Sequence, residues 1–312
     1  MRSRLFPLAV LFSLTAAAVA RAAEKPPRIL GISHVAVKAS DEEKSVAFYR
    51  DFLGFAEQGR LNYTNDGSLM LAFMKVNDDQ QIEIFDASKL KPESDKLYQI
   101  ALQVEDAEAL RAHLAASGYQ GRLPKAVSKG QLKNAGFTVK DPHGYTIEFV
   151  QYTPEGRTMQ EKGKFLSDAH ISDHIIHAGA VADDFEASAH FFRDLLGFKE
   201  SWRGTVDGKV LSWVHMRMGE SRDFVELMLE ATVKPHFCLE VPDIAKAKEK
   251  LEKTAYFKTY GKPIEARTGK NRKRQLNLFD PEGIRVELME PNTVDGQPVP
   301  PSDAPLPKRG KK

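Results

Sequence analysis

Apolar residues at strand-like and helix-like spacing follow one another in the same order several times along the chain. In the first stretch, a short β-rich run at 31–37 precedes apolar positions at helical spacing over 41–53, and strand-like runs follow at 68–75 and 81–85. Gly54 comes directly after the helical stretch, where glycine commonly ends a helix. These features predict one β-α-β-β-β unit.

A second unit of the same order follows. It contains a predicted strand over 99–104 and a helix over 107–116, with Asp106 as its N-cap and a serine-glycine pair at its end. The last two strands form a predicted hairpin across the Asp-Pro-His-Gly sequence at 141–144. This sequence suits a type I turn, because proline fixes φ at the second position and glycine relaxes the fourth.

The whole pattern is then repeated. The sequence FYRDFLGF at 48–55 returns as FFRDLLGF at 191–198, and the offset of 143 residues also carries His34 onto His177 and Glu83 onto Glu226. Predicted strands at 175–181 and 236–241 and a hairpin across 280–283 complete the second copy. Four related units in one chain indicate an internal repeat, which decides the fold prediction.

The termini differ in character from the repeats. Residues 1–22 read as an export signal, with a basic start, an apolar stretch and a small-x-small cleavage pattern, so that the mature protein begins near Ala23. An uncleaved membrane anchor is the alternative, which the shortness of the apolar part disfavours. Residues 152–172 are predicted to be an interdomain linker, and the proline-rich residues 291–312 a disordered tail. We expect an exported protein without stable membrane association after cleavage.

Composition narrows the range of partners and metal ligands. The 312 residues are long enough for two domains, and the formal net charge of +2 favours neither nucleic acid nor an anionic membrane as a partner. Cys238 is the only cysteine, so internal disulfides and thiolate metal cages are excluded. The metal ligands, if a metal is bound, are therefore expected to be nitrogen and oxygen atoms.

The repeated helix-end sequence and the Asp-Pro-x-Gly hairpins leading to glutamate make the chain resemble the vicinal oxygen chelate superfamily. That superfamily includes glyoxalase I, bleomycin and fosfomycin resistance proteins, methylmalonyl-CoA epimerase and extradiol ring-cleaving dioxygenases. The resemblance implies an α+β fold of four β-α-β-β-β units, arranged as two tandem glyoxalase-like domains at 29–151 and 173–290. Each domain is expected to form a curved, mostly antiparallel sheet around a cleft.

The resemblance also implies the positions of the metal ligands, on the first and last strands of each unit. They are His177, Glu226, His236 and Glu287 in domain 2, and His34, Glu83, Gln99 and Glu148 in domain 1. Two imidazoles and one or two carboxylates suit Zn²⁺, Ni²⁺, Mn²⁺ or Fe²⁺. The domain 1 set is weaker, because Gln99 replaces a histidine with a neutral amide.

The local sequence supports the two closing glutamates. Glu148 and Glu287 each alternate with apolar neighbours on a predicted strand, so they face away from those neighbours. If that face is covered, a buried carboxylate must be paired or bound to a metal. The alternative is a solvated sheet face, which is common in antiparallel sheets.

Three functions remain open at this stage. In the glyoxalase and epimerase branch, a glutamate serves as the base that moves a proton next to a carbonyl, a role for Glu226 or Glu287 here. In the extradiol dioxygenase branch the metal triad lies in the second domain, but residues 221–223 and Asn277 lack the histidine and tyrosine of that branch. The third function is sequestration of a small molecule without metal, as in the resistance proteins.

The substrate is not identified by the sequence. Glyoxalase I acts on a cytosolic glutathione adduct, which does not suit an exported chain, so a different small molecule is expected. The basic loop at 270–274 can hold an anionic group of that molecule, or it can simply be solvated. Among other histidines, His174 is expected at the surface or in packing, whereas Trp213 and His215 share one strand face and either line the cleft or belong to the core. The chain is expected to be a monomer or a homodimer.

Overall fold

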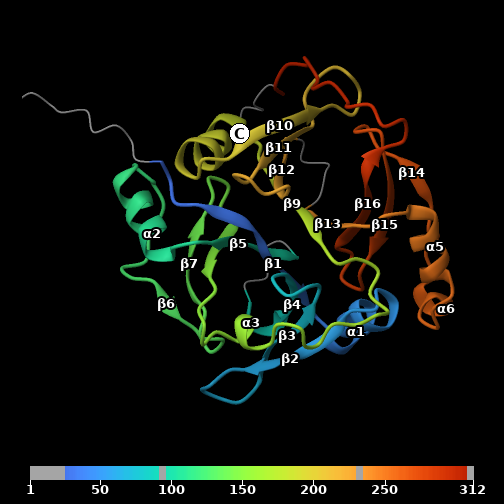
Figure 1. The fold of residues 1–312 in the computed structure, drawn as a ribbon, viewed down its shortest axis with the longest axis horizontal. Coiled ribbons are helices and arrows are strands. Elements are labelled where there is room, and N and C mark those ends of the chain that lie inside the picture. The colour runs from blue at the N-terminus through green and yellow to red at the C-terminus, as the bar shows by residue number, and fades with distance from the viewer. Residues whose placement is uncertain (1–24, 91–95, 230–234, 308–312) are drawn as a thin grey trace, which may run out of the picture.

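The computed structural model describes residues 25–90, 96–229 and 235–307, so the predicted export signal lies outside the described residues. Two sheets of eight strands each make up the fold (Figure 1). The first comprises β1 (Ile29–Ala39), β2 (Ala56–Asn62), β3 (Leu69–Lys75), β4 (Gln81–Asp86), β5 (Leu97–Val104), β6 (Ser128–Lys129), β7 (Ala135–Lys140) and β8 (Thr146–Gln151). The second comprises β9 (Ile175–Val181), β10 (Lys199–Gly204), β11 (Trp213–Arg217), β12 (Phe224–Met228), β13 (His236–Glu240), β14 (Ala266–Thr268), β15 (Lys273–Phe279) and β16 (Arg285–Thr293).

The two sheets have the same strand order, namely β2-β3-β4-β1-β5-β8-β7-β6 and β10-β11-β12-β9-β13-β16-β15-β14. In each sheet the first and fourth strands of a unit pair in parallel, as β1 with β4 and β12 with β9, and the two units join through an antiparallel pair. This arrangement confirms the predicted α+β fold of four β-α-β-β-β units.

Helices cover the sheets on their outer sides. They are α1 (Glu42–Ala47), α2 (Ala107–Ala116), α3 (Arg157–Gln160), α4 (Phe185–Ala189), α5 (Ile244–Glu252) and α6 (Phe257–Tyr260), with the π-helices η1 (Phe48–Phe52) and η3 (His190–Leu195) and the 3₁₀-helix η2 (Ala87–Lys89). The helix predicted over 41–53 is therefore α1 continued by a π-helical turn, in which Leu53 N donates to Phe48 O. The wider turn buries Phe48, Tyr49 and Phe52 together, and the same turn recurs in η3.

The glycine that ends this helix is required in both copies. Gly54 and Gly197 have φ values of +79° and +74°, in the left-handed region that favours glycine. A Cβ atom on Gly54 would also lie only 2.1 Å from the Ala169 carbonyl oxygen. The repeated Leu-Gly-Phe sequence is therefore explained by backbone geometry.

The two domains pack through their helices. The ring of Phe52 lies 5.2 Å from that of Tyr256 and 4.8 Å from that of Tyr260, so α1 and η1 of domain 1 meet α6 of domain 2 (Figure 1). At the other seam the ring of Tyr119 lies 6.0 Å from that of Phe191. One continuous apolar core includes buried residues of both sheets, because these seams connect them.

Part of the predicted disordered tail has regular structure and contacts in domain 2. Strand β16 continues to Thr293, and beyond it Leu211 N donates to Pro305 O at 2.8 Å and Ser302 N donates to Arg203 O at 3.0 Å. Ala304 and Leu306 pack against the core. The tail up to residue 307 therefore lies along domain 2, because the backbone groups at 203 and 211 and an apolar strip of the core give it partners. The linker region contains α3.

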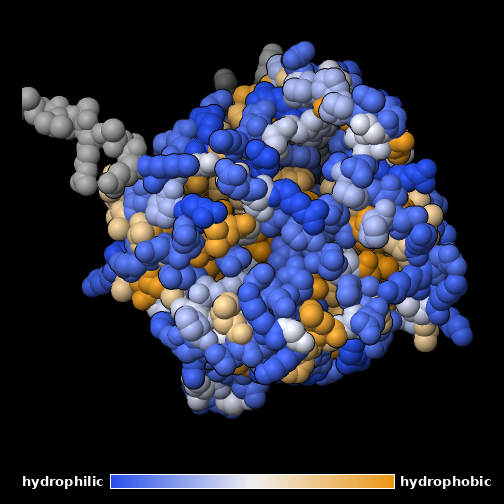
Figure 2. All heavy atoms as spheres, viewed as in Figure 1, coloured by the Kyte–Doolittle hydropathy of each residue, from blue (hydrophilic) through white to orange (hydrophobic). Residues whose placement is uncertain are grey.

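The outer surface seen in Figure 2 is mostly polar, with apolar residues in several separate patches. Within the part of the chain that the structure describes, no helix has the length and apolar character needed to cross a membrane.

Candidate metal centre

The four predicted ligands of domain 2 come from the four central strands of the second sheet. His177 lies on β9, Glu226 on β12, His236 on β13 and Glu287 on β16, and these strands are neighbours in the order β12-β9-β13-β16. Alternation along each strand places all four side chains on one face of the sheet. They lie at a cavity of about 550 Å³, which we call cleft 2, whose lining includes His177, Glu226 and Glu287.

The donor atoms converge on one small volume. His236 Nε2 lies 3.2 Å from His177 Nε2, 3.3 Å from Glu226 Oε2 and 3.4 Å from Glu287 Oε2. His177, Glu226 and His236 each offer a ligand atom within 4.8 Å of the others. All four side chains are buried, so these atoms are shielded from solvent. The structure therefore brings the predicted set together.

The electrostatics of the cluster also suit a cation. Burial lowers the pKa of His177 to about 3, so its imidazole is neutral at pH 7, and its Nδ1 atom has no hydrogen-bond partner among the described residues. Burial by itself raises both carboxyl pKa values, but His215 and His236 outweigh it at Glu226 and hold its pKa below the usual range. The pKa of Glu287 is likewise held low, by His236, His177 and Arg285. Neutral imidazole and ionised carboxylate are the forms that bind divalent metals.

Gly179 makes room for the second imidazole and was not singled out from the sequence. It is the register partner of both Glu226 and His236 on the neighbouring strands. A Cβ atom at this position would lie 2.9 Å from Cε1 and Nδ1 of the His236 ring. A glycine inside a strand often marks such a close approach, and this was the available sequence signal.

His215 is the second residue that the structure adds to the site. Its Nε2 lies 3.2 Å from Glu226 Oε1, and its ring lies 4.8 Å from the Trp202 ring. The sequence left open whether Trp213 and His215 line the cleft, and both do. His215 therefore contacts the carboxylate oxygen that does not face His236.

Cys238 lies closer to the site than the sequence suggested. Its Sγ atom lies within 4.8 Å of ligand atoms of His177 and Glu287, because Cys238 follows His236 by two residues and shares its strand face. Burial raises the pKa of the Cys238 thiol well above its ordinary value. A single cysteine cannot form a thiolate cage. Its Sγ atom is nevertheless a potential sulfur donor, whereas the sequence predicted only nitrogen and oxygen ligands.

The domain 1 set also converges, in a different chemical state. His34 Nε2 lies 3.5 Å from Glu83 Oε2, 3.4 Å from Glu148 Oε2 and 3.2 Å from Gln99 Nε2. Burial lowers the pKa of His34, but the carboxylates of Glu83 and Glu148 outweigh it and raise the pKa overall. These residues surround a cavity of about 470 Å³, cleft 1, which Glu83, Glu148 and His34 line.

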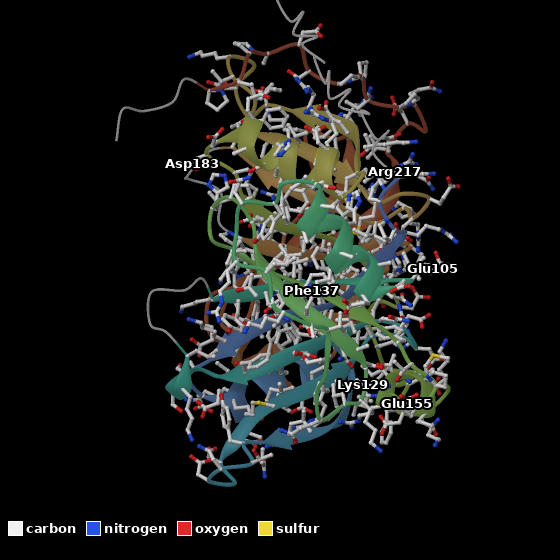
Figure 3. The ribbon with its side chains drawn as sticks, turned by 90° about the vertical axis from the view of Figure 1, so that its left-hand side faces the viewer. Glu105, Lys129, Phe137, Glu155, Asp183 and Arg217 are labelled. Carbon is white, nitrogen blue, oxygen red and sulfur yellow. The ribbon has the colours of Figure 1, made fainter. Side chains whose placement is uncertain are left out.

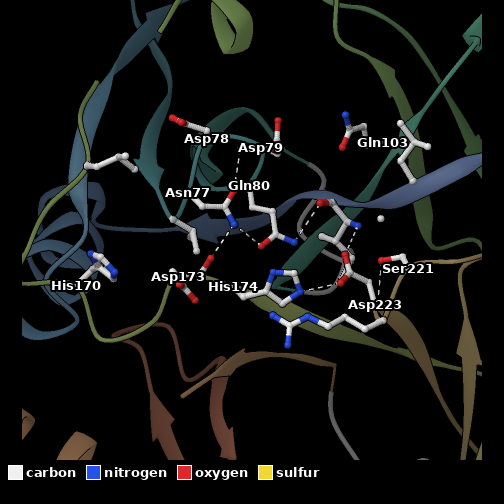
Figure 4. A pocket seen from close by; sticks show the side chains of 16 residues that line it. Asn77, Asp78, Asp79, Gln80, Gln103, His170, Asp173, His174, Ser221 and Asp223 are labelled. Carbon is white, nitrogen blue, oxygen red and sulfur yellow. Dashed lines mark hydrogen bonds and ion pairs between the residues drawn. The ribbon is translucent and has the colours of Figure 1, made fainter. Parts of the chain in front are cut away.

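The basic loop and His174, the remaining candidates from the sequence, lie at two different cavities. Lys270 and Asn271 of the basic loop line cleft 2, together with Arg267, Arg285 and Asn277. His174 instead lines a separate cavity of about 660 Å³ at the contact between the domains, where its Nε2 lies 2.7 Å from Asp223 Oδ1 (Figure 4). Asp223 also accepts a hydrogen bond from Ile32 N of domain 1, at 2.8 Å.

Comparison with known proteins agrees with this architecture. The model of the "Glyoxalase/Bleomycin resistance protein/Dioxygenase superfamily" matches residues 31–149 and 174–288. The chain is similar to the solved structure of a Mn(II)-bound glyoxalase from Novosphingobium aromaticivorans, with 18% identity, a TM-score of 0.63 and coverage of 90% of this chain and 89% of that one.

Two dioxygenases are similar at the same level. A variant of homoprotocatechuate 2,3-dioxygenase from Brevibacterium fuscum has 19% identity, a TM-score of 0.65 and coverage of 89% and 76%. The 2,3-dioxygenase LapB from Pseudomonas sp. KL28 has 18% identity, a TM-score of 0.65 and coverage of 89% and 98%. No curated protein matches the chain in sequence. The solved structures support the fold, and the match of the family model over most of the chain shows that it belongs to the Glyoxalase/Bleomycin resistance protein/Dioxygenase superfamily.

Proposed function

We propose that the chain is an exported, metal-dependent enzyme of the glyoxalase-like type, a lyase or isomerase that acts on a small molecule chelated through vicinal oxygens. The observation that carries this proposal is the convergence of His177, Glu226, His236 and Glu287 in cleft 2. A bound Zn²⁺, Ni²⁺, Mn²⁺ or Fe²⁺ ion would supply Lewis-acid polarisation of the substrate oxygens. A Mn(II)-bound glyoxalase among the similar structures agrees with this choice of metals.

Glu226 is the proposed base. Its Oε2 atom faces His236 and its Oε1 atom faces His215, so the carboxylate reaches from the ligand cluster toward the cavity. A carboxylate with a lowered pKa is ionised at neutral pH, which is the form that a general base requires. His215 orients this carboxylate, and the Trp202 ring packs against His215. Glu287 is the alternative base.

The substrate is proposed to carry an anionic group. Arg267, Lys270 and Arg285 line cleft 2, and guanidinium groups bind carboxylate and phosphate oxygens through paired hydrogen bonds. Export rests on the N-terminal sequence pattern, and sequencing of the mature N-terminus tests it, with Ala23 as the expected first residue. We propose a monomer or homodimer.

Extradiol ring cleavage is the second candidate function. His177, His236 and Glu287 form a set of two histidines and one carboxylate, the combination of non-haem iron oxygenases, and two dioxygenases are similar in fold. Against it, Asp223 is engaged with His174 and Ile32, and Asn277 stands where that branch has a tyrosine. Glu226 as a fourth donor favours the glyoxalase-like type.

The decisive experiment combines metal analysis with an isotope assay. Purified mature protein, as isolated and after reloading with each metal, is incubated in D₂O with compounds that carry vicinal oxygens beside an acidic C–H bond. Metal-dependent C–H exchange detected by NMR, and abolished in Glu226→Gln, is the expected result. Oxygen uptake with catechols instead indicates ring cleavage, and a protein with no bound or restorable divalent metal indicates sequestration.

A further inference from the structure

The two clefts are related by register, which allows position-by-position comparison. His236 pairs with Gly179 and Arg285, and Gln99 occupies the same place in domain 1, paired with Ala36 and Thr146. In the same way, His215 pairs with Glu226 where Phe73 pairs with Glu83. Cleft 1 thus has an amide, a phenyl ring and a hydroxyl where cleft 2 has two imidazoles and a guanidinium.

The polar floor of cleft 1 is closed by its own hydrogen bonds. Gln99 Nε2 donates to Glu148 Oε2, and Gln81 Nε2 donates to Glu83 Oε1 at 3.0 Å. The His34 imidazole lies between the two carboxylates. The oxygen atoms that face the centre of this cluster therefore already have hydrogen-bond or ion-pair partners without a metal ion.

The lining of cleft 1 combines apolar side chains with uncharged polar ones such as Gln131 and Asn134, and Lys140, which is not part of this lining, donates to Thr146 Oγ1 at 2.6 Å. Leu61, Met70, Leu71, Phe85 and Phe137 line the cleft, and within the described residues no lysine or arginine does. Lys129, on the strand beside this wall, is ion-paired with Glu155 (Figure 3). Cleft 1 is thus a largely apolar cavity with carboxylates at its floor, and it lacks the arginine and lysine side chains that accompany the carboxylates in cleft 2.

One carboxylate oxygen remains available to a ligand. The Glu148 side chain is 27% exposed and lines the cavity, and among the described residues no hydrogen bond reaches its Oε1 atom. A carboxylate is only an acceptor, so its partner must be a donor, and a cationic amine makes the stronger, charge-assisted bond. Aromatic rings such as Phe85 and Phe137 also favour a cation over an anion.

We propose that cleft 1 is a second, metal-free ligand site that binds a hydrophobic amine through Glu148. This site is independent of the metal-dependent reaction proposed for cleft 2. The chain accordingly holds two clefts of one architecture with opposite ligand preferences.

The test uses isothermal titration calorimetry of the full mature chain with 4-phenylbutylamine and the matched acid 4-phenylbutanoate. The amine is expected to bind at one site per chain, equally well before and after EDTA treatment, whereas the acid does not bind at this site. Glu148→Gln is expected to weaken amine binding about tenfold or more, because the charge-assisted bond is lost. Thr146→Arg, which installs the charge found at Arg285, is expected to weaken it as well.

The matched control is Glu287→Gln, the register equivalent in domain 2. It is expected to reduce metal content and to leave amine binding unchanged. Metal binding in cleft 2 and amine binding in cleft 1 are thus measured separately. Circular dichroism confirms that each variant is folded. Absence of amine binding to the wild type at millimolar concentration, loss of binding on EDTA treatment, or equal binding by folded Glu148→Gln would each overturn the proposal, whatever the outcome for metal in cleft 2.

Discussion

The Nε2 atoms of His177 and His236 lie 3.2 Å apart, although 59 residues separate them along the chain. Two imidazole nitrogens at this distance either share one N–H or direct both lone pairs at a common cation. Two ionised carboxylates reach the same point, and their buried charge needs compensation. A divalent cation would satisfy all four groups at once.

Removal of one imidazole tests this interpretation. His236→Ala leaves one histidine and two carboxylates, so we expect a wild-type content of about one transition metal per chain to fall to near zero. Inductively coupled plasma mass spectrometry after dialysis measures it. His190→Ala is the control, because this exposed histidine lies outside the cleft. Equal metal contents in all three proteins would contradict the assignment.

The reverse experiment builds a second centre in domain 1. Gln99→His alone is expected to gain no metal, because Ala36 stands where Gly179 makes room for the imidazole, and its Cβ atom would crowd the new ring. The double variant Ala36→Gly/Gln99→His relieves that contact and is expected to bind about two metals per chain. The same metal analysis decides it. A Gln99→His single variant that binds the second metal as well would show that Gly179 is not required.

The fold was largely predictable because its signals are local and repeated. The strand over 175–181 matches β9 and the helix over 107–116 matches α2, with Asp106 as its N-cap, because apolar periodicity and capping chemistry act within a few residues. Strand β2 was not recognised, since this edge strand has mostly polar, partly exposed side chains and a glycine in its interior. The π-helical turns were missed because apolar spacing does not distinguish them from α-helix.

The candidate site was predictable where the repeat or the family resemblance marks it. His177 and Glu226 stand at the offset of His34 and Glu83, but His215 has no polar counterpart, since Phe73 occupies its place in domain 1. Its role depends on cross-strand pairing with Glu226, a relationship that the sequence does not contain. The same holds for the tail, whose partners at residues 203 and 211 lie 99 and 94 residues before residues 302 and 305.

His215 is expected to act by orienting Glu226. His215→Phe copies the residue of domain 1 and removes the hydrogen bond to Glu226 Oε1 while keeping a ring against Trp202. We expect metal content to be retained and kcat for the proton exchange proposed above to fall about tenfold to a hundredfold, with a shifted pH profile. Loss of metal in this variant would instead assign His215 to the ligand set.

Deletion of the tail is expected to destabilise domain 2. A chain ending at residue 300 leaves Leu211 N and Arg203 O without their partners and uncovers the core beneath Leu306. The combined loss is expected to lower the free energy of unfolding by about 2 to 4 kcal/mol. Urea denaturation of the two lengths measures it. A chain ending at residue 307 is the control and should have the same free energy of unfolding as the full chain. If the chain ending at residue 300 is equally stable, the contacts of the tail do not stabilise domain 2.

The contact between the domains at Tyr49 and Asp280 predicts a pH dependence. Tyr49 OH donates to Asp280 Oδ2 at 3.2 Å, and burial raises the pKa of Asp280 to about 6. A carboxyl group whose pKa is higher in the folded state favours folding when it is protonated, so this contribution is present below the unfolded pKa and is lost as pH rises through about 6.

Asp280→Asn stays uncharged at every pH and can still accept the hydrogen bond from Ile284 N. We therefore expect its stability relative to wild type to increase between about pH 4 and pH 7, by on the order of 2 to 3 kcal/mol. Urea denaturation of both proteins across this range gives the difference, in which the pH dependence of unchanged groups cancels. Tyr49→Phe keeps the carboxyl group but removes a hydrogen bond that lowers the pKa of Asp280, so its pH dependence should persist and extend to higher pH than in wild type. A constant difference between Asp280→Asn and wild type would mean that Asp280 does not titrate in this range, and the domain seam would then not be sensitive to pH through this residue.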